Sequence, residues 1–258
     1  MIRVSASAFD ILWADLGHRE LPGPLLVHSV GSTRGERAEI RQDVYANLTE
    51  RGLCTEGELD PDLCARLEVL ASADLTVECE ALVDMAEAEP LRAVAAVAGR
   101  RAVLAAQPRR TIGLSEIRDT ELIPAAVGVL PDLEPGPGYG VSLPASALGS
   151  AVRDPVFAGG GAGGATSPAA GSAAFEQQIR EVLAIQARPV LGAGQFSVRM
   201  RENGRLRRVG GVSWFVTDVG AYLGAVAPGR GDEDWMTVAP VDSARLATRL
   251  ADIIDEAA

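Results

Sequence analysis

Residues able to bind a metal or form disulfides are few and scattered along the chain. The two histidines, His18 and His28, flank a proline-containing stretch, and no paired cysteine completes a ligand set with them. The cysteines are odd in number and lack CxxC spacing: Cys54, Cys64 and Cys79. Zinc sites need about four ligands at short spacings, and disulfide frameworks need paired cysteines. The pattern therefore predicts no metal site, no cofactor and no disulfide framework, and a reducing compartment fits it.

Residues for nucleophilic or phosphate chemistry are lacking too. The sequence has no GxSxG elbow, and no serine or cysteine lies in an evident histidine and aspartate context. The Gly-rich tract 158–172 lacks the GK[ST] ending of a phosphate-binding loop, and Gly192 and Gly194 precede a predicted strand instead of opening a helix. Carboxylates are plentiful, but their abundance does not select an acid–base pair. We therefore predict no catalytic residues and a protein that is not an enzyme.

The composition narrows the kinds of partner. The chain has 258 residues, 47% of them hydrophobic, and a net charge of −11 with arginine as its only strongly basic residue. This acidity argues against a nucleic-acid or anionic-membrane surface as the main binding function. No stretch approaches the roughly 18 apolar residues of a membrane span, and the N-terminus lacks the apolar run of a signal peptide. We predict a cytoplasmic protein with no nucleic-acid partner and no membrane insertion.

Hydrophobic periodicity predicts the elements of the first half. A short strand at 2–5 precedes two helices, and a third helix begins at Asp60 and Pro61. Alternating patterns then predict strands at four places: 75–82, 91–98, 101–107 and 111–117. A helix from about Asp119 to Leu130 closes this half.

The second half shows a similar order. A helix near Phe175 is followed by the stretch 195–206, in which Asn203-Gly204 predicts a tight hairpin turn. Further strands are expected at 212–218, 221–226 and 234–240, and Asp242 caps a last helix. The order of elements in 60–130 thus recurs in 173–256. The predicted fold is α+β, with a quasi-two-fold duplicated antiparallel β-sheet core flanked by helical bundles.

The repeat also predicts the domain organisation. Residues 1–131 form the N-terminal half and first repeat, and residues 132–258 form the C-terminal half and second repeat. The tract 158–172 is expected to be a flexible Gly-rich loop within the second half. Both halves are expected to join in one compact domain and to present one broad surface, as a binding scaffold does.

Opposite charges occupy matching positions of the two repeats. Glu78 and Glu80 stand where Arg199 and Arg201 stand in the second copy. If the copies join edge to edge, these side chains would pair across the pseudo-dyad. The alternative is that each charge lies on a solvated sheet face.

Three sequence features occur together in a characteristic order. A tryptophan-containing helix is followed by LPGPL, Gly-Leu after a helix is followed by Asp-Pro, and a Trp-x-Thr strand precedes the last helix. In this order they resemble the EspG family of chaperones of type VII (ESX) secretion, over nearly the whole chain and least over 132–172. The resemblance implies a cytosolic, non-enzymatic chaperone that binds the helical tip of PE–PPE heterodimers and covers its apolar surface before secretion.

The same resemblance implies where the partner binds. In the family the partner touches the central sheet, the loop after its second strand and the C-terminal helical bundle. The matching loop is 83–90, in which Met85 would be an adaptable apolar contact and the acidic residues would be rim charges. The expected partner-binding residues are Val83, Asp84, Met85, Glu87, Glu89, Arg199 and Arg201. The alternative for the loop is an ordinary solvated hairpin.

Other functions remain open at this point. The chief alternative is a small-molecule-binding or enzymatic α+β domain whose site is assembled from distant residues, and another is a structural subunit of a stable complex. A deep enclosed pocket would favour the small-molecule alternative, whereas a broad groove on the sheet would favour the chaperone. The expected partners are PE/PPE-like or WXG-type helical secreted proteins, with a homodimer as a further assembly to test.

Overall fold

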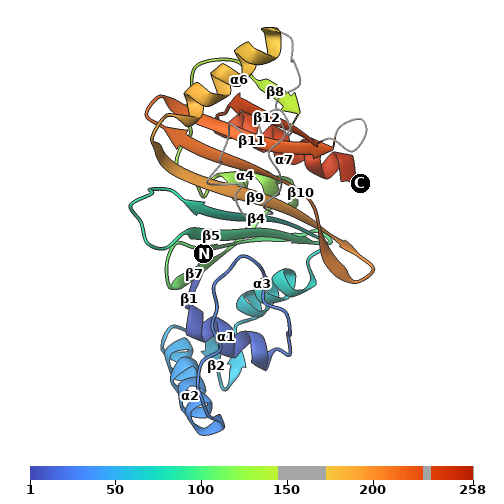
Figure 1. Cartoon of the computed structure of the whole chain (residues 1–258). Coiled ribbons are helices and arrows are strands. Elements are labelled where there is room, and N and C mark those ends of the chain that lie inside the picture. Colours follow the sequence, from blue (N-terminus) through green and yellow to red (C-terminus); the bar gives the residue numbers. More distant parts are fainter. Residues whose placement is uncertain (145–172, 229–233, 258) are drawn as a thin grey trace.

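One large antiparallel sheet organises the molecule (Figure 1). The computed structural model describes residues 1–144, 173–228 and 234–257, so the predicted Gly-rich loop 158–172 lies outside the described residues. Ten strands follow the order β1-β7-β6-β5-β4-β9-β10-β11-β12-β8. They are β1 (Ile2–Ser5), β4 (Leu75–Leu82), β5 (Leu91–Ala98), β6 (Arg101–Gln107), β7 (Thr111–Ile117), β8 (Val141–Pro144), β9 (Val190–Glu202), β10 (Arg205–Thr217), β11 (Gly220–Pro228) and β12 (Asp234–Pro240).

Strands β4 to β7 form a meander with the bounds that the sequence predicts. Each strand alternates side chains between the two sheet faces, and short turns separate the strands. In the β5–β6 turn Gly99 has a φ of 60°, a conformation that favours glycine. The α+β class and the antiparallel sheet are therefore confirmed.

Strands β9 and β10 form the longest hairpin of the sheet. Its turn is Asn203-Gly204, with φ values of 50° and 79°, as a type I′ turn requires. Strand β9 begins at Val190, so the prediction that Gly192 and Gly194 precede the strand is wrong. A Cβ on Gly192 would lie 2.5 Å from the carbonyl oxygen of Val83. Glycine in β9 thus permits close approach of β4 and does not mark a loop.

The described part of the chain has six α-helices. They are α1 (Ala6–Asp15), α2 (Arg34–Glu50), α3 (Pro61–Ser72), α4 (Leu122–Val127), α6 (Ala173–Gln186) and α7 (Ser243–Ala257). A 3-10 turn (Asp119–Glu121) precedes α4, and a small hairpin of β2 (Cys54–Thr55) and β3 (Glu58–Leu59) follows α2. Helix α2 packs against α1 and this small hairpin. The helix expected to reach Leu130 ends at Val127, where the Gly128 N–H donates to Pro124 O at 2.8 Å.

The helices cover the two sheet faces unequally. Helices α4 and α7 bury one face around Trp214 and Phe196, in a core shared by both halves. On the opposite face, α1 and α3 bury β5 to β7 around Phe9 and Leu67. Helix α6 packs on the same opposite face at its far end, where Tyr222 belongs to a third, smaller core. Between α3 and α6, no described helix covers this face of the sheet.

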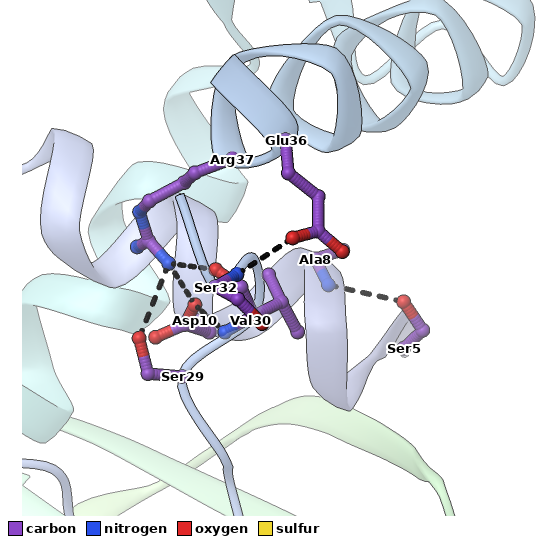
Figure 2. A network of polar contacts seen from close by, with 8 residues as sticks. All are labelled: Ser5, Ala8, Asp10, Ser29, Val30, Ser32, Glu36 and Arg37. Carbon is purple, nitrogen blue, oxygen red and sulfur yellow. Dashed lines mark hydrogen bonds and ion pairs between the residues drawn. The ribbon is translucent and has the colours of Figure 1, made fainter. Parts of the chain in front are cut away.

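A strap at residues 18–33 crosses from α1 to α2 and is held by a buried polar network (Figure 2). Asp10 of α1 accepts hydrogen bonds from Val30 N–H at 3.0 Å and from Arg37 Nη1 at 2.6 Å. The Gln107 side chain, 2% exposed, donates to Leu26 O at 2.9 Å and accepts from Leu26 N–H at 2.7 Å. Because Asp10 and Gln107 both have hydrogen-bond partners in the strap, they hold it against α1 and the sheet.

Candidate docking surface

The middle of one sheet face is open. Strands β4, β9 and β10 cross the molecule between α3 and α6 (Figure 1), and their main helix contacts come from α4 and α7 on the other face. The strand register aligns the positions on this face in rows: Glu78 lies opposite Ser197, and Gly211 lies opposite Ser197 on the next strand. A second row aligns Glu80 with Gln195. We call this strip of β4, β9 and β10 the open face.

Two shallow depressions lie along the open face and share Gln195. One, of about 370 Å3, runs over β10 towards Val226 of β11. The other, of about 330 Å3, lies over the ends of β4 and β9 beside Pro90. Both are lined by neighbouring strand residues, several of them glycine or alanine, so the side chains leave space for a partner. The surface is broad and grooved along the strands.

Ion pairs neutralise much of the charge on the open face. Arg199 Nε donates to Glu78 Oε2 at 2.9 Å, as the predicted pairing across the pseudo-dyad requires. The second predicted pair is wrong: Glu80 contacts Arg92 at 3.2 Å, because these two residues lie directly opposite on β4 and β5. Arg201 instead donates to backbone carbonyls, including Ala73 O at 2.7 Å. The charges are therefore fixed within the sheet.

The loop 83–90 is an ordered turn at one end of the open face. Asp84 Oδ1 accepts from Ala86 N–H at 2.8 Å, and Asp84 O accepts from Glu87 N–H at 2.9 Å. Met85 N–H donates to Leu191 O of β9 at 2.9 Å. The side chains of Met85 and Leu191 are 48% and 49% exposed. The loop thus adds two accessible apolar side chains beside the sheet.

The predicted partner-binding residues fall into two groups. Val83, Asp84, Met85, Glu87 and Glu89 lie at one end of the β4–β9 pair. Arg199 and Arg201 lie near its other end, where Arg199 stands opposite Thr76, roughly 20 Å away at about 3.3 Å per residue. The structure does not bring the two groups together in one pocket; it places them on one continuous strip.

Several residues on or beside the open face escaped prediction from the sequence. They are Leu191, Gln195, Ser213 and Val226. The alternating pattern of β9 could have indicated Gln195, since this residue shares a face with Ser197 and Arg199. Ser213 and Val226 become recognisable only when the register and the positions of the helices are known.

The described residues offer little for metal or thiol chemistry. Residues 1–144, 173–228 and 234–257 contain no cluster of three metal-ligating side chains. Cys54, Cys64 and Cys79 are free thiols, and burial raises the pKa of Cys79 to about 12. A thiol with so high a pKa is almost entirely protonated near neutral pH and is a poor nucleophile. None of the described helices is both long and apolar enough to cross a bilayer.

The fold and the open face define an α+β protein with a broad sheet surface, and comparisons place it in a family. The EspG family model matches residues 5–252. The fold resembles that of the type VII secretion system chaperone EspG5 of Mycobacterium tuberculosis, solved in complex with a PE25–PPE41 dimer. The two share 14% identity and a TM-score of 0.69, over 98% of this chain and 95% of that one. No curated protein matches the chain.

The chain belongs to the EspG family of type VII secretion chaperones. The resemblance inferred from the tryptophan helix, the LPGPL stretch and the late Trp-x-Thr strand is thereby confirmed. Membership also confirms the prediction of a chaperone over an enzyme.

Proposed function

We propose that this chain is a cytosolic chaperone that binds helical PE–PPE-type secretion substrates on its open face, keeps them soluble and delivers them to an ESX secretion machinery. The observation that carries the proposal is the strip of β4, β9 and β10 between α3 and α6, which no described helix covers on this face. A helical tip laid on it would cover apolar partner surface that otherwise promotes aggregation. The PE25–PPE41 dimer bound to EspG5 indicates the kind of partner.

The chemistry of the open face supports a transient protein partner. Met85 and Leu191 offer apolar contacts at one end, and Met85 can adapt its shape. Glu80 pairs with Arg92 and Glu78 pairs with Arg199, so a partner would not have to leave these four charges buried and unpaired. The depressions follow the strands and are not enclosed by other layers, which favours a partner's surface over an enclosed small molecule.

We also propose that the sheet arose from two repeats, 1–131 and 132–258, within one compact domain. Strands β4 to β7 and β9 to β12 run outwards in the same order from the central β4–β9 pair, and β1 and β8 end the two sides. Val77 pairs with Val198 at the centre, so a two-fold rotation about this pair would place Glu78 at the position of Arg199. Superposition of the two halves by a two-fold rotation would support the repeat; a rotation far from two-fold would contradict it.

Co-expression tests the chaperone proposal. The tagged chain should co-purify with a PE–PPE-type pair encoded near its gene and should keep that pair soluble. A WXG-type helical pair and an unrelated helical bundle serve as the alternative partner and the control. Failure to retain any helical secretion substrate, together with substrates that stay soluble alone, would contradict the proposal.

A further inference from the structure

A third depression lies where the open face meets the strap. It has a volume of about 350 Å3 and lies between the strap residues 20–23, strands β4 and β9, and the turn of the β9–β10 hairpin. Three arginines line it: Arg199, Arg201 and Arg205. We call it the arginine pocket. It is the only one of the three depressions with walls from the strap, a helix and the sheet together.

A buried hydroxyl group faces this pocket without a partner. Thr76 is 3% exposed, and its Oγ1 makes no hydrogen bond among the described residues. Thr76 lies directly opposite Arg199 in the β4–β9 register and belongs to the pocket lining. An unpaired buried hydroxyl costs about 1–3 kcal/mol in general, and an acceptor bound in the pocket would relieve that cost.

Charge around the pocket favours an anionic acceptor. Two glutamates, Glu20 and Glu78, line it with the three arginines, so its lining carries a net charge of +1 although the chain carries −11. Glu78 pairs with Arg199. Arg201 donates only to the backbone carbonyls of residues 71, 73 and 204, and no described carboxylate pairs with Arg201 or Arg205. A guanidinium group without a carboxylate is suited to bind one.

We propose that the arginine pocket binds an aspartate or glutamate side chain of the helical partner. Arg201 and Arg205 supply the positive charge, and Thr76 donates a hydrogen bond to a carboxylate oxygen. This proposal rests on the chaperone function proposed above and adds to it an electrostatic anchor at the opposite end of the open face from Met85. A carboxylate held there would fix the orientation of the partner along the strip.

Two variants separate this binding role from a structural one. Thr76→Val removes the hydroxyl with little change of shape, so it should raise the unfolding temperature while weakening binding of the co-purified PE–PPE-type partner several-fold. Arg205→Gln should weaken binding roughly 10- to 100-fold, the range for a hydrogen bond to a charged group. Arg207→Gln is the matched control, since Arg207 is on the same hairpin but pairs with Glu202 outside the pocket. It should bind as the wild type does.

A partner-free titration tests the chemistry of the pocket. N-acetylglutamate α-amide should shift the NMR signals of the Thr76 amide and the Arg201 Nε–H in the full chain, whereas the neutral N-acetylglutamine amide should not. If the wild type retains no helical partner, the chaperone proposal fails. If it retains one, but Thr76→Val and Arg205→Gln bind like Arg207→Gln and the acid shifts no pocket signal, the arginine pocket proposal alone is overturned.

Discussion

Arg199 of β9 donates a hydrogen bond from Nε to Glu78 Oε2 of β4 at 2.9 Å, across the strand pair that joins the two halves of the chain. The two side chains differ in exposure: Glu78 is 11% exposed and Arg199 is 39% exposed. The pair is therefore asymmetric. Loss of the arginine would leave a largely buried carboxylate, whereas loss of the glutamate charge would leave a cation that can still reach water.

Substitutions at this pair should reveal the asymmetry. Arg199→Met should lower the free energy of unfolding by about 2 kcal/mol, because the buried carboxylate loses its partner. Glu78→Gln should cost less than about 1 kcal/mol, since Arg199 stays solvated. Urea unfolding at pH 7 measures both, and the double variant gives the coupling energy. If both single variants lose the same free energy of unfolding and the double variant shows no coupling energy, the Glu78–Arg199 pair does not stabilise the fold.

The strap should depend on Asp10 more than on its neighbour Asp15. Asp10→Asn weakens two hydrogen bonds in the buried network of Figure 2 and should cost about 2 kcal/mol, with faster proteolysis within 18–33. Asp15→Asn is the matched control on the same helix: its pair with Arg41 is more exposed and should be worth less than about 1 kcal/mol. Equal effects of the two substitutions on stability and cleavage would contradict this account of the strap.

Stability should fall in alkaline solution because of Cys79. Its pKa is about 12 in the folded chain, raised by burial and then by Glu80, against 9.0 for an unperturbed cysteine. Between these pH values the unfolded chain has released the thiol proton and the folded chain has not, so the Cys79 contribution should decline by about 1.4 kcal/mol per pH unit as the pH rises. Calorimetry of wild type and Cys79→Ala isolates this slope; identical pH profiles would contradict it.

Met85 should contribute to binding and not to stability. Met85→Asp places a charge on a side chain that is 48% exposed, so the unfolding temperature should change little while partner affinity falls about tenfold. Tyr139→Asp is the matched control, an exposed apolar residue outside the open face, with 88% of its surface accessible. If Met85→Asp binds the partner as tightly as Tyr139→Asp does, the loop is an ordinary solvated hairpin.

Much of the sheet could be predicted because its signals are local. Strands β4 to β7 alternate apolar and polar residues between clear turns, and the Asn203-Gly204 turn fixes the β9–β10 hairpin. The start of β9 could not be predicted in this way. Glycines such as Gly192 and Gly194 are typical of loops, so the sequence does not indicate that the strand includes them. The structure explains why glycine stands there: β4 lies so close that a Cβ on Gly194 would be 2.7 Å from the Cβ of Ala81.

The candidate site was predictable in part for a similar reason. Repeat positions predicted that Glu78 and Arg199 would pair, and they do. The same logic failed for Glu80, because its cross-strand neighbour on β5 is Arg92 and sequence alone does not give that register. The open face depends on which helices cover which strands, a property of the whole fold that no local pattern contains.

The most direct measurement is the affinity of the purified chain for its PE–PPE-type partner after one substitution on the open face. Gln195 lies in both depressions of that face, whereas Gln42 lies exposed on α2, so Gln195→Arg and Gln42→Arg make the same chemical change at two surfaces. With unfolding temperatures within a few degrees of the wild type, Gln195→Arg should weaken calorimetrically measured binding at least tenfold and Gln42→Arg should not. Wild-type affinity for Gln195→Arg would contradict the assignment of the open face as the docking surface.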